Sequence, residues 1–184
     1  MTNRLQDKAR HLSEQRRKTA ARLRPAVEAE IHTLKMDKAS FEVLLQKLPE
    51  EGEHFLNVKG MDDVEFYLST NRGEELKPLA RIASGGELSR IVLAMKKVLA
   101  GSGSVGTIIF DEVDTGIGGA VAEIVGEKLR DVSGHYQVIC ITHLPQIACF
   151  ANRHFLVSKQ ETAARTKTII RSLSEEERLD EIAR

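Results

Sequence analysis

The chain has 184 residues, enough for one domain and an appendage, and its 41% hydrophobic and 29% charged residues are typical of soluble globular proteins. The formal net charge is zero, so overall charge favours neither nucleic acid nor a membrane surface as a partner. No apolar run has the length of a membrane span or of a signal peptide. Cys140 and Cys149 belong to no Cys-x-x-Cys pair, which predicts reduced, buried thiols in a cytoplasmic protein rather than a disulfide or metal site.

The first 35 residues predict a helix, because they lack glycine and are rich in Arg, Ala, Leu, Gln and Glu. Pro25 should kink or divide this helix. A weak heptad pattern, interrupted at Arg16 and Glu30, favours one strand of a coiled coil whose partner lies elsewhere. Its members are Leu5, Ala9, Leu12, Thr19, Leu23 and Ala26. An amphipathic helix that packs on its own domain is the alternative.

Positive charge is concentrated in this segment. Residues 1–36 carry nine Lys and Arg against four Asp and Glu. The basic run Arg16-Arg17-Lys18 is more often a solvated helix face than a DNA contact, so we keep DNA contact as the second interpretation.

The rest of the chain alternates between strand and helix patterns. The expected elements are a strand or helix end at 39–45, a strand at 64–68, a helix after Gly86, a strand at 107–111, a helix at 120–131, a strand at 137–142, a short helix at Pro145, a hairpin over 154–157 and 166–170, and a last helix opened by a capping box at 174–177. Continuous apolar strands alternating with helices predict an α/β fold with a parallel sheet buried on both faces.

No phosphate-binding loop of the G-x-x-x-x-G-K-[ST] type is present, because no glycine in the chain is followed by lysine. Residues 101–106 match G-x-G-x-x-G, but that fingerprint requires a strand before it and a helix after it. Here the expected order is reversed, so we reject the match. The chain lacks the usual cradle for a nucleoside triphosphate.

The segment Ser84-Gly85-Gly86-Glu87 opens the helix that follows it. Serine with glutamate three residues later is a capping box, which needs no function. Two adjacent glycines each cost about 1 kcal/mol relative to alanine in a helix, so capping alone does not explain why glycine occupies both positions. A turn without β-carbons exposes N–H groups at the positive end of a helix, where an anion such as phosphate can bind.

Two acids and a histidine follow the apolar strands. Asp111 and Glu112 end the strand expected at 107–111, and His143 ends the next one. In phosphate-transfer enzymes an aspartate at such a place holds Mg²⁺, and a second carboxylate can accept the proton of the attacking water. The imidazole can donate to phosphate or orient that water.

These motifs, taken in order, resemble the C-terminal half of an ABC-type ATPase head. The runs 82–90 (IASGGELSR), 110–119 (FDEVDTGIGG) and 141–147 (ITHLPQI) resemble the RecN family of bacterial DNA repair proteins, which are coiled-coil relatives of the SMC proteins. The resemblance covers roughly residues 30–184. It implies the C-terminal lobe of an ABC/SMC-type P-loop ATPase head at 37–184, a parallel sheet flanked by helices, with a coiled-coil arm helix at 1–36.

The resemblance also implies a role for each motif residue. The cofactors would be ATP and Mg²⁺, with the ATP cradle supplied by a missing N-terminal lobe of the same protein. Ser84, Gly85, Gly86 and Glu87 would form the signature turn, which contacts ATP held by the opposite subunit. Asp111 would bind Mg²⁺ and Glu112 would be the catalytic glutamate. Asp114 would be the D-loop aspartate, which contributes to nucleotide binding, and His143 would be the switch histidine, which senses the γ-phosphate.

Two functions are therefore expected from the sequence. The first is a double-strand-break repair ATPase whose heads form a homodimer around ATP and act on DNA in the cytoplasm, at the nucleoid. This chain would then be a C-terminal fragment, inactive alone. The second is a non-catalytic DNA-binding or dimerisation clamp, for which the basic segment 1–36 is the only support.

Overall fold

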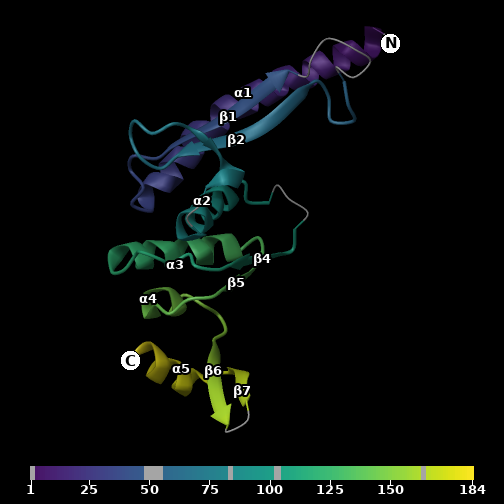
Figure 1. Ribbon diagram of the computed structural model, residues 1–184. Coiled ribbons are helices and arrows are strands. Elements are labelled where there is room, and N and C mark those ends of the chain that lie inside the picture. The colour runs from purple at the N-terminus through teal and green to yellow at the C-terminus, as the bar shows by residue number, and fades with distance from the viewer. Residues whose placement is uncertain (1–2, 48–55, 83–84, 102–104, 163–164) are drawn as a thin grey trace. The chain divides into compact units, whose positions relative to one another are not determined.

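The computed structural model describes residues 3–47, 56–82, 85–101, 105–162 and 165–184 (Figure 1). The chain divides into two compact units, Met1–Leu99 and Ala100–Arg184, called unit 1 and unit 2 below. No helix in the described ranges is long and apolar enough to cross a membrane.

Unit 1 begins with the long helix α1, Asn3–Thr33, which confirms the predicted N-terminal helix. Pro25 lies inside α1 without dividing it. Helix α1 contacts β1 and α2, and the side chains that it buries are small or branched. Its buried members are Ala9, Ser13, Val27 and Ile31. Of the predicted heptad positions only Ala9 is among these buried residues, and Leu5 and Leu12 are 45% and 40% exposed, so the coiled-coil role stays a prediction.

The strands of unit 1 form an antiparallel sheet in the order β1-β2-β3. The apolar run that could have been a strand or a helix end is strand β1, Ser40–Lys47, and it pairs along its whole length with β2, Asp62–Ser69. Two residues of β3, Lys77–Pro78, complete the sheet. Phe41 of β1 is fully buried and stacks on Phe66 with 5.7 Å between ring centroids. Figure 1 shows α1 lying along these strands.

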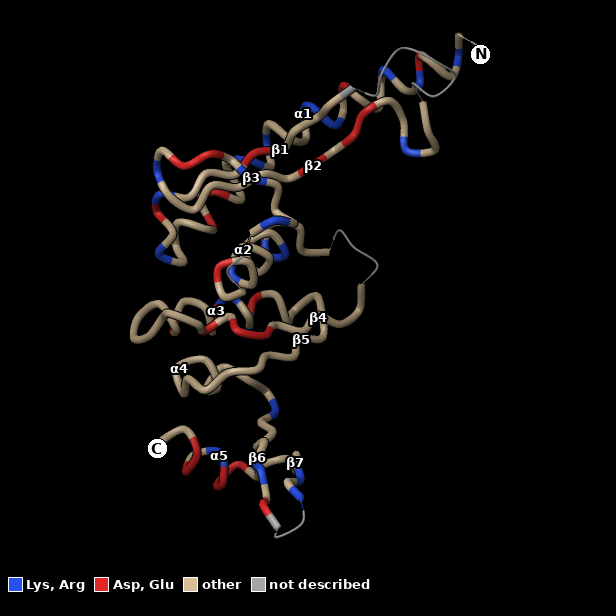
Figure 2. The backbone as a smooth tube through the Cα atoms, viewed as in Figure 1, with Lys and Arg blue, Asp and Glu red and all other residues tan. Residues whose placement is uncertain are grey.

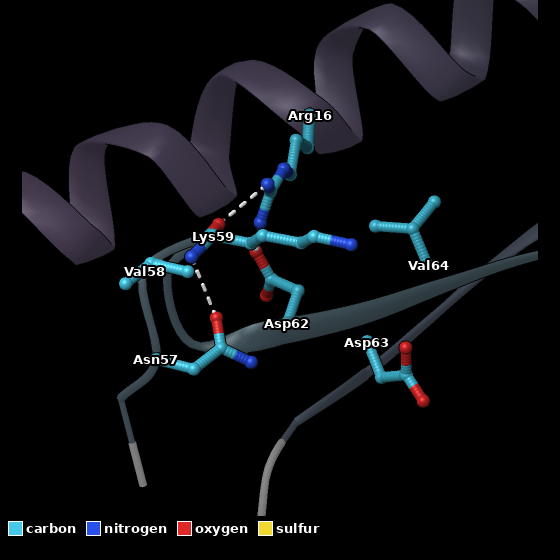
Figure 3. A pocket seen from close by; sticks show the side chains of 7 residues that line it. All are labelled: Arg16, Asn57, Val58, Lys59, Asp62, Asp63 and Val64. Atoms are coloured by element: carbon cyan, nitrogen blue, oxygen red, sulfur yellow. Dashed lines mark hydrogen bonds and ion pairs between the residues drawn. The ribbon is translucent and has the colours of Figure 1, made fainter.

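A buried carboxylate fastens α1 to the start of β2. Asp62 accepts a hydrogen bond from the Ser13 hydroxyl at 2.7 Å and pairs with Arg16 at 3.1 Å. The Arg16 guanidinium also donates to the Lys59 carbonyl at 2.6 Å, which holds the turn before β2 against the helix (Figure 3). A β-carbon at Gly60 would lie 3.1 Å from the Leu12 side chain, so glycine permits this close approach.

This arrangement corrects the interpretation of the basic run. Arg16 is not a solvated cation, because its charge is neutralised by Asp62. Arg17 and Lys18 are exposed, as predicted for a solvated face. The pocket of about 420 Å³ beside Arg16 contains this ion pair, so we assign it a structural role (Figure 3).

The Asp62 contacts give a stability prediction. Asp62→Ala should lower the free energy of unfolding by about 2 kcal/mol, because the buried Ser13 hydroxyl loses its partner and the Arg16 guanidinium keeps only the Lys59 carbonyl. Asp63→Ala is the matched control: its side chain is exposed, and it should change stability by less than about 0.5 kcal/mol. Urea unfolding of both variants measures the difference, and equal midpoints would show that the Asp62 contacts do not stabilise unit 1.

Unit 1 ends with α2, Gly85–Val98, preceded by the short 3₁₀ helix η1, Leu79–Arg81. The helix predicted after Gly86 is confirmed, and it buries Ile91, Leu93 and Ala94. Helix α2 contacts α1, and Lys97 lies 3.6 Å from Glu30 across that contact. Ser84, and with it the predicted capping box, lies outside the described residues.

Unit 2 contains the predicted parallel pair of strands. Strand β4, Thr107–Phe110, pairs in parallel with β5, Gln137–Cys140, and α3, Ala120–Ser133, connects them (Figure 1). The prediction that both faces of this sheet are buried is wrong. Ile109 and Ile139, which are opposite each other in register, are 64% and 46% exposed. A single crossover places its one helix on one face only, so the other face of the pair stays open.

Helix α3 contacts the short helix α4, Pro145–Ala148, and Gly126 of α3 lies close to the segment that contains α4. A β-carbon on Gly126 would lie 2.3 Å from a ring carbon of Phe150. The Phe150 ring also lies under the Arg130 guanidinium, 5.2 Å from its centroid. Glycine in mid-helix therefore allows the segment after His143 to dock closely on α3.

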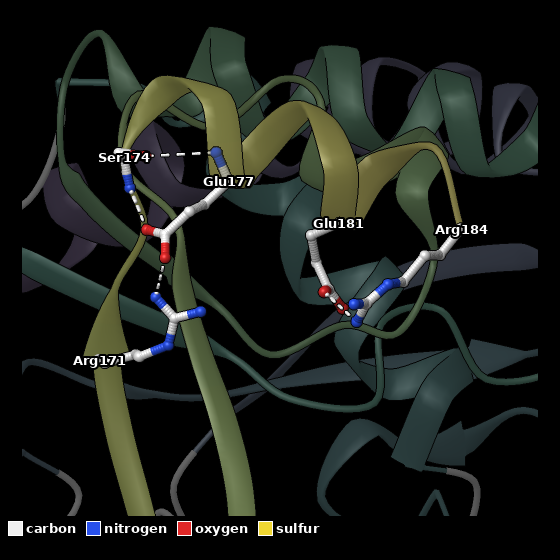
Figure 4. Close-up of polar contacts among 5 residues, drawn as sticks. All are labelled: Arg171, Ser174, Glu177, Glu181 and Arg184. Carbon is white, nitrogen blue, oxygen red and sulfur yellow. Dashed lines mark hydrogen bonds and ion pairs between the residues drawn. The ribbon is translucent and has the colours of Figure 1, made fainter.

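The C-terminal elements confirm the predicted hairpin and capping box. Strands β6, Phe155–Thr162, and β7, Arg165–Ser172, pair antiparallel. Helix α5, Glu175–Ile182, is capped by reciprocal bonds: the Glu177 amide donates to the Ser174 hydroxyl, and the Ser174 amide donates to the Glu177 carboxylate (Figure 4). Arg171 of β7 donates to the same carboxylate, which joins the hairpin to α5.

The cysteines are less buried than the sequence predicts. Cys149 is exposed and Cys140 is half-buried. Both are free thiols, as predicted. Burial, with smaller contributions from Asp114 and Asp111, raises the pKa of Cys140 to about 12, so its thiol stays protonated at neutral pH.

Candidate active site

The candidate site lies at the carboxyl ends of β4 and β5. Phe110 and Cys140 are opposite each other at the last pair of the ladder, and the Ile141 amide donates to the Phe110 carbonyl at 2.9 Å. Parallel strands direct their carboxyl ends to one edge of a sheet. Asp111 and Glu112 after β4 and His143 after β5 therefore share an edge, as the sequence predicts.

Glu112 has an unusual backbone conformation. Its φ is 58°, in the left-handed region that residues with a β-carbon rarely adopt. Local bonds hold it there: its amide donates to Asp111 Oδ1 at 2.9 Å, and its carbonyl accepts from the Thr115 amide at 3.0 Å. The Glu112 side chain is exposed. Left-handed residues cluster at active sites, where the surrounding structure holds a side chain in a required direction.

Asp114 is buried and connects the two loops of the site. Its Oδ2 accepts from the Thr142 hydroxyl at 2.6 Å and from the His143 amide at 3.0 Å, and it lies 3.1 Å from His143 Nδ1. Burial raises the pKa of the Asp114 carboxyl, but these hydrogen bonds outweigh burial and hold the pKa below its usual value. Asp114 is thus a carboxylate at neutral pH, and it accepts hydrogen bonds without donating any.

His143 is held from one side and open on the other. Its side chain is 78% exposed, although its Nδ1 contacts the buried Asp114. Because Nδ1 faces the protein, Nε2 is the ring nitrogen that a ligand at this edge would meet.

The described residues of the predicted signature turn, Gly85, Gly86 and Glu87, belong to unit 1, whereas the acids and His143 belong to unit 2. Gly85 is exposed and Gly86 is buried at the first turn of α2, where Glu87 is the acidic residue. An exposed Gly85 fits the predicted backbone contact with an anion. The structure therefore brings together Asp111, Glu112, Asp114 and His143.

A magnesium ion fits the chemistry of Asp111, although the described residues contain no cluster of three metal-ligating side chains. Mg²⁺ is commonly bound by one or two carboxylates together with substrate phosphates and water. A single aspartate at the strand end therefore suits Mg²⁺ that arrives with a nucleotide, and does not suit a permanently bound metal.

Sequence reasoning missed Thr142. The sequence shows a Thr-His pair at the end of β5, but the motifs give a role to the histidine alone. Its hydroxyl donates to Asp114 and accepts from the Leu144 amide at 3.0 Å, so it links the two loops. A hydroxyl residue directly before the histidine was the available signal.

Comparison with known proteins supports the resemblance. No protein-family model matches the chain. It is 47% identical over 169 residues to the DNA repair protein RecN of Halalkalibacterium halodurans, covering 92% of this chain and 30% of that protein. It is 41% identical over 186 residues to RecN of Bacillus subtilis, covering 96% and 32%. The predicted resemblance to RecN is confirmed. The chain spans about a third of the length of these curated relatives.

Solved structures confirm the fold predicted for this RecN-like chain. An Smc head domain with a coiled coil and joint from Pyrococcus yayanosii matches with a TM-score of 0.57 and 18% identity, over 92% of this chain and 29% of that one. An Smc head with an extended coiled coil from Pyrococcus furiosus matches with a TM-score of 0.54 and 20% identity, over 92% and 39%. The chain therefore has a mixed α/β, SMC head-like fold with a long N-terminal helix.

The backbone of Glu112 gives a prediction that is independent of any ligand. Glu112→Gly and Glu112→Ala both remove the carboxylate, but only glycine adopts a φ of 58° without steric cost. Glu112→Gly should therefore be more stable than Glu112→Ala by about 0.5–1 kcal/mol. Thermal or urea unfolding of the two variants measures this. Greater stability of the alanine variant would mean that residue 112 does not occupy the left-handed region.

Proposed function

We propose that this chain is the C-terminal lobe of an ATPase head in a RecN-type DNA repair protein, divided into an arm at 1–36 and a lobe at 37–184. The observation that carries the proposal is the edge of the β4–β5 pair. There an exposed, left-handed Glu112 follows Asp111, and a buried Asp114 holds His143. The similarity to RecN proteins supports a role in DNA repair.

Each residue of this edge has a proposed task. Glu112 accepts the proton of the water that attacks the γ-phosphate, and His143 contacts that water or the phosphate. Asp111 is the side chain that would hold Mg²⁺, which neutralises charge on the phosphates when bound. Ser84, Gly85, Gly86 and Glu87 contact ATP held by the opposite subunit, so hydrolysis needs a homodimer of heads.

The rest of the head comes, in this proposal, from an N-terminal lobe with the phosphate-binding loop that this chain lacks. The open face of the β4–β5 pair supports a covering lobe. Ile109 and Ile139 lie on that face, and Ile141 follows β5 with 56% of its surface exposed. Exposed apolar side chains that gather in one place commonly mark an interface. The chain alone should then neither bind ATP tightly nor hydrolyse it.

A DNA-binding or dimerisation clamp is the second candidate. Basic residues recur along α1 (Figure 2), and Arg17 and Lys18 are exposed. Salt-dependent DNA binding that is lost in Arg17→Ala with Lys18→Ala would support it. Arg16 is left unchanged in this test because it pairs with Asp62. The clamp does not explain the strained Glu112.

The proposal is tested by Glu112→Gln in a full-length RecN-type protein that contains this chain. The amide cannot take a proton from water, so ATP turnover should fall by about 100-fold or more while ATP-bound dimers accumulate. Glu127→Gln is the matched control, because it makes the same change on an exposed turn of α3 and should leave turnover intact. Steady-state ATPase assays and size-exclusion chromatography give the two readouts. Unchanged turnover in Glu112→Gln would remove Glu112 from its proposed role.

A further inference from the structure

We propose that one exposed face of α1 binds the phosphate backbone of duplex DNA. Four cations on this face, called the cation row below, make the contact: Arg4, Lys8, Lys18 and Arg22. The inference goes beyond the proposed ATPase role, because the contact needs neither ATP nor a second lobe. It also differs from the clamp candidate, which depends on the exposed cations of the basic run and not on one face of the helix.

The spacing of the cation row places its members on one side of α1, along which Lys and Arg recur (Figure 2). Successive members are four, ten and four residues apart, so at 100° per residue all of them fall within about 80° of arc. The buried Ala9 and Val27 lie about 140° from the centre of the row. At a rise of 1.5 Å per residue the row is about 27 Å long, which matches about eight phosphates of one DNA strand at 3.4 Å each.

The charges of the cation row are not neutralised within the part of the chain that the structure describes. All four side chains are exposed, and none forms a hydrogen bond or an ion pair with another described residue. Other cations of α1 do have partners. Arg16 pairs with Asp62, and Arg24 lies 3.5 Å from Glu28 and 3.7 Å from Glu42. The row is therefore the part of the basic segment that remains available to an external anion.

The charge around the row favours a polyanion over a single small anion. Residues 3–24 carry eight Lys and Arg against two acids, Asp7 and Glu14. Phosphates at a regular spacing can meet several of these cations at once, and each contact releases a counterion from the DNA. An anionic membrane fits less well, because a helix that lies in a membrane surface buries its apolar face in lipid, whereas α1 packs against β1 and α2.

Fluorescence anisotropy of a labelled DNA duplex, titrated with this chain without nucleotide, tests the proposal. Four phosphate contacts predict that log K falls with log salt concentration with a slope of about −3.5. Lys8→Glu combined with Arg22→Glu should weaken binding by about tenfold or more and make this slope shallower by about two, because two phosphate contacts are lost. Since ATP hydrolysis takes no part in this assay, a negative result leaves the proposed function standing.

Arg10→Glu combined with Arg17→Glu is the matched control. It makes the same change of charge at two exposed residues of the same helix, about 120–140° from the centre of the row, and should weaken binding by less than about threefold. Far-UV circular dichroism verifies that both variants are folded. Equal weakening in the two variants would overturn the proposal, because diffuse positive charge would then explain the binding. No binding at low salt, or binding to phosphatidylserine vesicles without binding to the duplex, would overturn it as well.

Discussion

The parallel pairing of β4 with β5 is the constraint on which the candidate site depends. Because the strands run in the same direction and end together at Phe110 and Cys140, the loops that follow them leave the sheet at one edge. A one-residue shift in this register would move every side chain of one strand to the opposite face. The contact between Asp114 and His143 then joins the two loops, so strand pairing and loop contacts place the acids and the imidazole together.

The elements could largely be predicted because their signals are local. The helix after Gly86, the strands β4 and β5 and the capping box at Ser174 were each predicted from residues close together in the sequence, and each is confirmed. The pairing of Arg16 with Asp62 could not be predicted, since it joins residues 46 apart in the sequence. From the sequence alone, a run of basic residues predicts a solvent-exposed face. Only the folded structure shows that Arg16 of this run pairs with an acidic side chain.

The sequence predicts which residues form the candidate site, but it does not predict their backbone conformation or their burial. Motif spacing identified Asp111, Glu112 and His143 as residues of one sheet edge. Nothing local indicated that Glu112 would have a positive φ, because glutamate has no preference for that region. The burial of Asp114 and the role of Thr142 depend on the approach of two loops 28 residues apart. Strand composition also predicted burial on both faces, but composition does not tell which elements are present to cover each face.

The central claim is that this chain supplies hydrolytic residues and a signature turn but no cradle for the nucleotide. It is tested most directly by ATPase assays on the isolated chain and on the chain mixed with the separately produced N-terminal part of a full-length RecN-type protein. The account predicts no turnover by the chain alone and turnover in the mixture that requires Glu112. Turnover by the isolated chain that Glu112→Gln abolishes would contradict it, because the chain would then hold ATP by itself.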